Sequence, residues 1–86
     1  MYNVYVIKSK VDVRLYKGMT QDVRKRIIEH NSGKQKYTKG YRPWELVYVK
    51  EFSTRNEARI HEKYLKSGIG REFLMTILDN KFESLT

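Results

Sequence analysis

The stretch LYKGMTQDVRKRIIEHNSG, from Leu15 to Gly33, predicts the end of a strand, a tight turn and then a helix. Thr20 is a suitable N-cap residue, and Gly33 favours a helix end near Ser32. Residues four apart lie on one side of a helix. Arg26 and His30 are therefore expected together, between core and solvent, beside an apolar face made of Val23, Ile27 and Ile28.

Three segments have the composition of strands. Residues 1–10 alternate with a period of two, and residues 11–18 form a second short strand that contains Tyr16. The connection near residues 10–12 is short, which predicts an antiparallel pair. Residues 44–52, WELVYVKEF, are rich in β-branched and aromatic residues and form the clearest strand of the chain.

Two further helices are expected after the third strand. Thr54 and Glu57 fit a capping box, and the helix that follows is expected to end near Lys66. The SGIG segment at residues 67–70 predicts a break, and residues 71–80 predict a last helix whose apolar side is Phe73, Leu74, Ile77 and Leu78. The order β-β-α-β-α-α predicts an α/β fold, with a small three-stranded, mainly antiparallel sheet flanked by helices.

The length of 86 residues fits one domain, which we expect over residues 1–80, with a C-terminal tail at 81–86. The chain has no cysteine, which excludes disulfides and thiolate metal sites. No apolar run is longer than Val4–Ile7, so we expect no membrane-spanning helix and no secretion signal. We expect a cytoplasmic protein.

The net charge of +8 is concentrated in the first half of the chain. Residues 1–43 contain 11 Lys and Arg and 3 acidic residues, whereas residues 44–86 contain 7 of each kind. This polarised distribution favours a polyanion such as nucleic acid as the partner. A plain basic surface and an acidic protein partner are the alternatives.

Glu62 has an unusual position in the second predicted helix. It comes four residues after Ala58 and three before Leu65, so the helical period places its carboxylate within the buried face that these two residues define. Such a carboxylate is costly unless it is paired or bound to a cation. It either pairs with a buried arginine, extends past the edge of the core, or holds a hard metal ion such as Mg²⁺.

The other candidate residues also have structural explanations. Tyr5 and Tyr16 fit as ordinary sheet tyrosines. Arg26 could pair with Asp22 one turn earlier, and His30 suits the C-terminal end of a helix. The residues alone therefore indicate a basic α/β nucleic-acid-binding domain with a candidate site for one metal ion.

The same residues resemble the GIY-YIG nuclease family. Its two strand signatures correspond to NVY at residues 3–5 and YKG at residues 16–18, and the two tyrosines are eleven residues apart. Its helix pattern Asp-hydrophobic-x-x-Arg corresponds to residues 22–26, followed by His-Asn at residues 30–31. The segments TKGYRPWELVY and EARIHEKYLKSGIGREFL are similar to the small single-domain branch named for excinuclease C. The resemblance covers residues 2 to about 78.

The resemblance implies hydrolysis of phosphodiesters with one divalent ion, Mg²⁺ or Mn²⁺. Tyr16 would act as general base toward water, assisted by Tyr5 or His30. Arg26 would stabilise the charge that develops on the phosphate, and Glu62, matched through EARIHE, would hold the metal. Gly18 would allow a tight backbone turn where the strand meets the site.

A basic segment without acidic residues follows the first predicted helix. Phosphate contacts from its cations and stacking from its tyrosines suit a single-stranded or distorted nucleic acid, whereas a solvated loop is the alternative. Together with Lys17 of the second strand, the predicted nucleic-acid-binding residues are Lys34, Lys36, Tyr37, Lys39 and Arg42.

The sequence therefore predicts a metal-dependent endonuclease that acts on DNA, with branched, flapped or single-stranded substrates in repair or recombination. A catalytically inactive domain that binds DNA or structured RNA is the alternative, and a basic protein-interaction adaptor is a third reading. No helix-turn-helix or zinc finger is recognisable. We expect low intrinsic sequence specificity unless a homodimer or a repair-protein partner supplies it.

Overall fold

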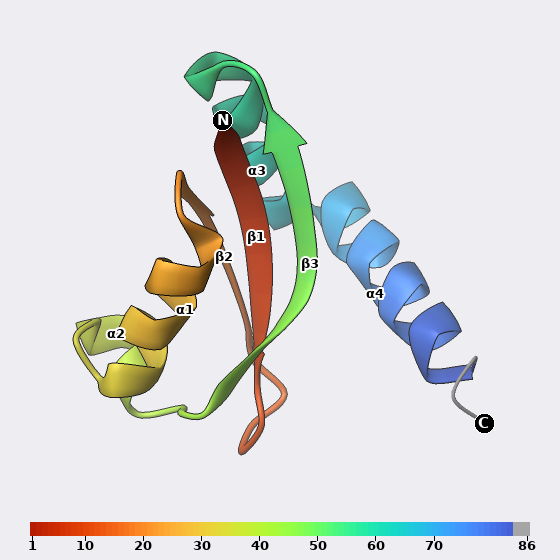
Figure 1. Ribbon diagram of the computed structural model, residues 1–86. Helices are drawn as coiled ribbons and strands as arrows, with labels where there is room; N and C mark the ends of the chain where they lie inside the picture. The colour runs from red at the N-terminus through yellow and green to blue at the C-terminus, as the bar shows by residue number, and fades with distance from the viewer. Residues whose placement is uncertain (84–86) are drawn as a thin grey trace.

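The computed structural model describes the backbone of residues 1–83 and the side chains of residues 1–78. Three strands, β1 (Tyr2–Ser9), β2 (Leu15–Thr20) and β3 (Trp44–Phe52), form one sheet in the order β2-β1-β3. Both strand pairs are antiparallel, which confirms the predicted sheet. Helices lie on both sides of this sheet, with α1 and α2 on one side and α4 on the other (Figure 1).

The second strand is shorter than predicted at its start. It begins at Leu15 instead of Val11, and residues 10–14 form the hairpin connection. Ser9 accounts for this early turn, because its hydroxyl donates to the carbonyl of Tyr41 at 2.7 Å and accepts from the amide of Val11 at 3.2 Å. These two bonds direct the chain away from β1 immediately after its last residue.

The first helix, α1 (Val23–Ser32), begins two residues later than predicted. Asp22 is its N-cap, because the Asp22 carboxylate accepts from the Lys25 amide at 3.0 Å. The Thr20 hydroxyl instead accepts from the Asp22 amide at 3.1 Å, so it shapes the turn before the cap. Gly33 ends the helix with a φ of 86°, a backbone conformation that glycine adopts without strain.

The other helices differ from the prediction in two places. A four-residue helix, α2 (Lys36–Lys39), lies within the segment predicted as a loop. The helix α3 (Arg55–Lys66) begins as predicted at the Thr54 cap, whose hydroxyl accepts from the Glu57 amide at 3.2 Å. The predicted four-residue break is reduced to Ser67, because α4 (Gly68–Glu83) starts directly after it.

The boundary predicted at residue 80 falls inside α4, which continues to Glu83. Residues 84–86 of the predicted tail lie outside the described residues. Among the described residues, no helix has both the length and the apolar character that crossing a membrane requires.

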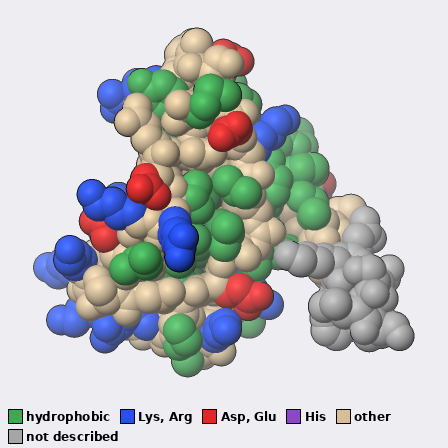
Figure 2. Space-filling model, viewed as in Figure 1, with side chains coloured by type: hydrophobic (Ala, Val, Ile, Leu, Met, Phe, Trp, Pro, Cys, Tyr) green, Lys and Arg blue, Asp and Glu red, His purple; other side chains and the backbone are tan. Residues whose placement is uncertain are grey.

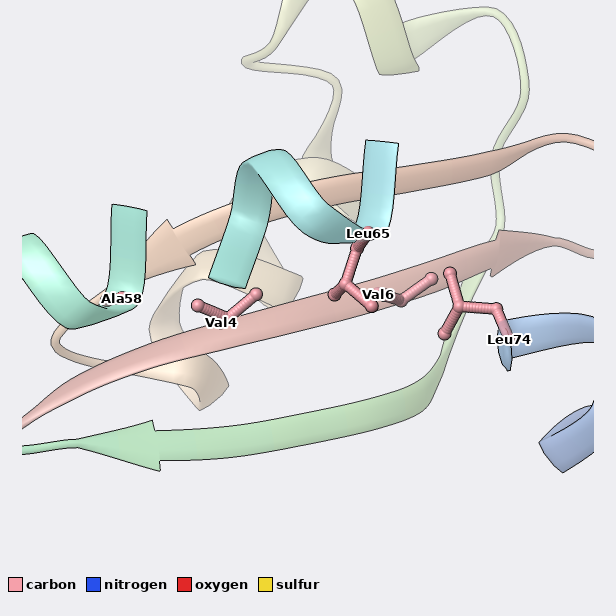
Figure 3. Close-up of a cluster of buried hydrophobic side chains, with 5 residues drawn as sticks. All are labelled: Val4, Val6, Ala58, Leu65 and Leu74. Carbon is pink, nitrogen blue, oxygen red and sulfur yellow. The ribbon is translucent and has the colours of Figure 1, made fainter. Parts of the chain in front are cut away.

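The alternation of β1 builds a core on each face of the sheet. Val4 and Val6 face α3 and α4, where they pack with Ala58, Leu65 and Leu74 (Figure 3). Burying a valine or leucine side chain contributes about 1.5–3 kcal/mol, so this cluster fixes α3 and α4 against the sheet.

The opposite face of β1 carries Tyr5 and Ile7, which pack with Trp44 and with the half-buried Ile27 of α1. Ile28, which the period placed on the same apolar face, is instead 61% exposed. The cause is the position of α1, which turns only one narrow stripe toward the sheet. That stripe is occupied by Ile27 and His30.

Candidate functional site

Two tyrosines and a histidine converge on the α1 face of the sheet. Tyr5 lies opposite Gly18, and Ile7 lies opposite Tyr16, so Tyr5 and Tyr16 point to the same side. The centroids of their rings are 6.4 Å apart. The ring of His30, from α1, lies 5.9 Å from the ring of Tyr5 and 4.9 Å from that of Tyr16.

His30 is completely buried, whereas the sequence predicted it between core and solvent. Its Nε2 lies 2.9 Å from the hydroxyl of Tyr5, and its Nδ1 lies 2.9 Å from the hydroxyl of Thr38. The Thr38 hydroxyl in turn donates to the carbonyl of Gln35 at 3.4 Å. We infer that Nδ1 carries the proton and donates to Thr38, while Nε2 accepts from Tyr5. This chain connects β1, α1 and α2.

The pKa values of this pair agree with that assignment. Burial raises the pKa of Tyr5, although interaction with the Arg26 guanidinium opposes the rise, and the nearby Tyr16 and Glu62 charges add to it more weakly. Burial also lowers the pKa of His30, and the positive charge of Arg26 lowers it further. At neutral pH Tyr5 is therefore a neutral phenol and His30 a neutral imidazole.

The lowered histidine pKa predicts that the free energy of unfolding decreases in weak acid. In the unfolded chain His30 takes up a proton near its ordinary value of 6.5, whereas the folded chain resists protonation. Stability is thus fully present above about pH 6.5 and decreases as the pH falls below it, by at most about 1.4 kcal/mol per pH unit per histidine. His61, whose pKa burial also lowers, contributes in the same direction.

Urea unfolding at a series of pH values between neutral and weakly acidic measures this decrease. Each histidine contributes to the slope of the free energy of unfolding against pH. Replacing His61 with Gln should remove its contribution, and replacing His30 with Gln should remove the rest. A parent protein with equal stability across the whole series would contradict the assignment of a neutral His30.

Arg26 lies beside this aromatic cluster. Its interaction with the Tyr5 hydroxyl raises the pKa of Arg26. Its ion-pair partner is Glu29 at 3.8 Å, and the predicted pair with Asp22 does not form because Asp22 caps the helix. Within the part of the chain that the structure describes, the Nε of Arg26 is buried and has no hydrogen-bond partner. A buried donor on a charged group is costly when it is unpaired, and a phosphate oxygen is a suitable acceptor for it.

Gly18 has a different role from the predicted one. It lies inside β2, so it forms no turn. A Cβ atom at this position would lie 2.6 Å from the Tyr5 hydroxyl oxygen and 2.7 Å from the ring carbon that bears it. Glycine is therefore required because the Tyr5 ring passes over the backbone of β2 on its way to His30.

Replacing Gly18 with alanine is expected to decrease the free energy of unfolding by about 1–3 kcal/mol, the usual cost of an added methyl group in a packed core. Tyr5 is buried on all sides and cannot move away without breaking its bond to His30. The Gly40→Ala variant is the matched control, because a Cβ there meets no atom within 4 Å. Urea unfolding of the two variants should separate them, and equal stabilities would contradict the close contact.

Glu62 lies in α3 and is half-buried, whereas the helical period predicted it inside the buried face. Its partner is Lys66, whose ammonium lies 3.1 Å from Oε1, so the predicted alternative of a buried arginine partner is wrong. Lys66 also lines a hollow of about 260 Å³ together with Tyr16, Lys17 and Tyr37. Glu62 therefore lies close to this hollow.

The donor set around Glu62 decides which metal it could hold. Among the described residues, no group of three or more His, Cys, Asp or Glu side chains is close enough together to bind a metal. A single carboxylate is an insufficient site for zinc. It fits Mg²⁺ or Mn²⁺, which keep several waters and take further oxygen ligands from a substrate phosphate.

The basic segment brings one of its tyrosines to the cluster. The ring of Tyr37 lies 5.9 Å from the ring of Tyr16 and is exposed. Lys34, Lys36 and Lys39 are exposed, and Figure 2 shows cations gathered around α2 and the adjoining end of α1. The Nε of Arg42 donates to the Lys39 carbonyl at 2.9 Å, so one of its donors is used within the protein and not offered to a nucleic acid.

Thr38 is a residue of this site that the sequence analysis missed. It is completely buried, and its carbonyl accepts from the indole of Trp44 at 2.8 Å while its hydroxyl contacts His30. It is located in a one-turn helix, which is too short to show a period in the sequence. No signal in the sequence distinguishes it from a threonine in a loop.

The chain matches a known protein family over most of its length. A family model described as the GIY-YIG catalytic domain matches residues 1–72. The chain belongs to the GIY-YIG family. This family consists of nucleases that act on nucleic acid and generally use a divalent metal ion.

Similar proteins of this family are small. A UPF0213 protein of Staphylococcus saprophyticus is 46% identical over 65 residues, which cover 74% of this chain and 78% of that protein. The UPF0213 protein YazA of Bacillus subtilis is 49% identical over 63 residues, which cover 72% of this chain and 63% of YazA. The solution NMR structure of the UPF0213 protein BH0048 from Bacillus halodurans is 37% identical, with a TM-score of 0.58 and coverage of 100% of this chain and 95% of that chain. The likeness to BH0048 therefore extends beyond the residues that the family model covers.

Proposed function

We propose that this protein is a metal-dependent endonuclease that hydrolyses phosphodiester bonds in DNA, with branched, flapped or single-stranded segments as its substrates. The observation that carries the proposal is Arg26, a charged side chain with a buried and unpartnered Nε beside Tyr5. Membership of the GIY-YIG family supports the same reaction. A role in repair or recombination agrees with substrates of this kind.

In the proposed reaction Arg26 and Tyr16 contact the substrate. The planar guanidinium of Arg26 binds the phosphate and stabilises the negative charge that develops as water attacks. Tyr16, which lines the hollow, acts as a phenolate that accepts a proton from that water and becomes the neutral phenol. Both side chains are partly exposed, so substrate can reach them.

Tyr5 and His30 are positioning residues in this proposal. Both are buried, so neither reaches a substrate directly. Their hydrogen bond, continued to Thr38, fixes the Tyr5 ring against Tyr16 and holds α1 at the distance from the sheet that places Arg26. The tyrosine–histidine cluster thereby keeps the reacting groups in place.

Glu62 is the proposed ligand of Mg²⁺ or Mn²⁺. Its carboxylate, which pairs with Lys66 in the structure, would bind the ion. When bound, such an ion supplies positive charge that stabilises the leaving oxygen. Tyr37 and the exposed lysines of residues 34–39 are proposed to contact the sugar, base and phosphate groups of the same nucleic acid.

Cleavage of labelled branched, flapped, single-stranded and blunt duplex DNA tests the proposal, in Mg²⁺, in Mn²⁺ and in EDTA. We expect cutting with either metal and none in EDTA. Tight binding without cutting in either metal would overturn the assignment of an endonuclease and would favour the inactive binding domain. Parallel assays on RNA of the same sequence decide between the two nucleic acids.

A further inference from the structure

A second and larger hollow lies between β2 and α4. It has a volume of about 430 Å³, and its lining includes Lys8, Leu15, Lys17, Arg71 and Met75. This volume falls within the range of roughly 300–1,000 Å³ that is typical of clefts for small ligands. Lys8, Arg71 and Met75 are not among the candidate residues predicted from the sequence.

The lining of this hollow combines cations with exposed apolar side chains. Lys8, Lys17 and Arg71 are the charged residues among its described lining residues, and they come from β1, β2 and α4. Val13 and Met75 are 88% and 61% exposed, although both are large and apolar. A surface that offers an apolar wall beside positive charge suits a ligand with a flat apolar part and an anionic part.

The positive charges around this hollow are close enough to lower the pKa of Lys17. Burial lowers the pKa of Lys17, and the charges of Arg71 and Lys66 lower it further. Lys66 has Glu62 as a partner, whereas the repulsion between Lys17 and Arg71 is relieved by any anion that settles between them. Together with the three cations that line this hollow, this repulsion favours an anionic occupant.

The two hollows share part of their lining at the edge of the sheet. Leu15 and Lys17 line both of them, while Tyr16 between these residues lines only the smaller hollow. Since β2 is one of the two edge strands of the sheet, a chain passing over its free edge contacts both sides (Figure 1). Adjacent residues of a strand are about 3.3 Å apart, so the passage between the two hollows is short.

We propose that the hollow beside Arg71 binds an unpaired nucleotide of a single DNA strand that flanks the phosphate held near Tyr16 and Arg26. The base contacts the apolar wall at Met75 and Val13, and the flanking phosphates contact Lys17 and Arg71. This inference rests on the proposed function, because the position of the reacting phosphate defines the flank. The proposed occupant is one unpaired nucleotide, so a blunt duplex is not expected to use this hollow.

Fluorescence anisotropy in EDTA tests the site without requiring cleavage. The probes are a labelled oligothymidylate of roughly 12 nucleotides, a blunt duplex hairpin and an oligothymidylate with abasic sites. We expect Arg71→Ala to weaken binding of the single strand by about tenfold. We also expect it to reduce the slope of log affinity against log salt by about 0.7. The Arg59→Ala variant is the matched control, because Arg59 is exposed on α3 and lines neither hollow.

The Met75→Asn variant tests the base contact separately from the phosphate contacts. It should weaken binding of the oligothymidylate and leave binding of the abasic strand unchanged, because the abasic strand has no base to lose. Both Met75 and Arg71 are exposed, and equal thermal melts of parent and variants check that the fold is retained.

Three outcomes would overturn the inference. The first is equal affinity and equal salt slope for parent and Arg71→Ala. The second is an equally large loss on the blunt duplex, which would mean that no unpaired nucleotide is bound. The third is Arg71-dependent binding of labelled oligoglutamate with no Arg71 dependence on DNA, which would indicate an acidic protein segment as the occupant.

The outcome for this site and the outcome for the proposed enzyme are separable. Metal-dependent cleavage together with Arg71-independent binding overturns the nucleotide site and leaves the endonuclease. Arg71-dependent binding of the single strand without cleavage in any metal supports the nucleotide site and overturns the endonuclease.

Discussion

Replacing Arg26 with alanine is expected to reduce the rate of metal-dependent cleavage by about two to three orders of magnitude, the usual loss when one charge-stabilising donor is removed from an active site. The fold should remain. Arg26 contacts the rest of the protein through a long ion pair with Glu29 at 3.8 Å and through the Tyr5 hydroxyl, and its buried Nε has no partner within the described residues. Its side chain is partly exposed and its ion pair is long, so it contributes little to stability and is available to a substrate.

Two further variants show whether the cleavage rate depends on the planar shape of the Arg26 guanidinium or only on positive charge on α1. Arg26→Lys keeps the positive charge but loses the planar fork, so it should recover only a small part of the rate. Arg24→Ala removes an exposed arginine from the same helix and should leave the rate unchanged. Cleavage of the preferred DNA substrate under single-turnover conditions measures all three variants.

A second measurement on Arg26→Ala does not depend on activity. Because the charge of Arg26 lowers the pKa of His30, its removal should raise that pKa, and NMR titration of the histidine ring reports the change. Cleavage at the parental rate by Arg26→Ala would refute the assigned role. An unchanged His30 titration would refute the proximity on which it depends.

The strands and the long helices of the fold were predictable because their signals extend over many residues. The alternation of β1, the β-branched run of β3 and the Thr54 cap of α3 are repeated or reinforced locally, and all three are confirmed. The one-turn helix α2 and the late start of β2 were not predictable. Each is caused by a few contacts with distant residues, such as the bond from Ser9 to Tyr41.

The proximity of four candidate residues was predictable, but their environment was not. Tyr5, Tyr16, Arg26 and His30 do converge, as the spacing and the resemblance suggested. The helical period cannot tell which member is buried, because burial depends on how α2 covers the end of α1. For the same reason neither the Thr38 contact nor the packing role of Gly18 could be deduced from sequence alone.

Glu62→Gln is expected to abolish detectable cleavage and to leave the stability of the metal-free protein nearly unchanged. A metal ion contributes several kcal/mol to transition-state stabilisation, which corresponds to about three orders of magnitude in rate. The ion pair that the change removes is worth little, because the side chain of Lys66 is 53% exposed and an exposed pair contributes about 0–1 kcal/mol. The loss of about 3–5 kcal/mol that follows when a buried pair is broken is not expected here.

Two variants provide the controls. Lys66→Met breaks the same ion pair but keeps the carboxylate, so in EDTA it should melt like Glu62→Gln while it retains metal binding. Glu51→Gln removes an exposed carboxylate from β3, at the opposite edge of the sheet, and should change neither cleavage nor metal affinity. Thermal melts of each protein in EDTA and in excess Mn²⁺ measure stability and metal binding in one experiment, since a ligand that binds only the folded state raises the melting temperature.

The parent and both controls should be stabilised by Mn²⁺, and Glu62→Gln should not. Equal stabilisation of Glu62→Gln by Mn²⁺ would mean that other oxygens hold the ion, and the metal site would then have to be sought elsewhere in the chain. A melting temperature in EDTA far below that of Lys66→Met would mean that Glu62 supports the fold through a contact other than Lys66. Only the combination of level stability, lost metal response and lost cleavage assigns Glu62 to the metal, because each alternative role of the carboxylate changes at least one of these three results.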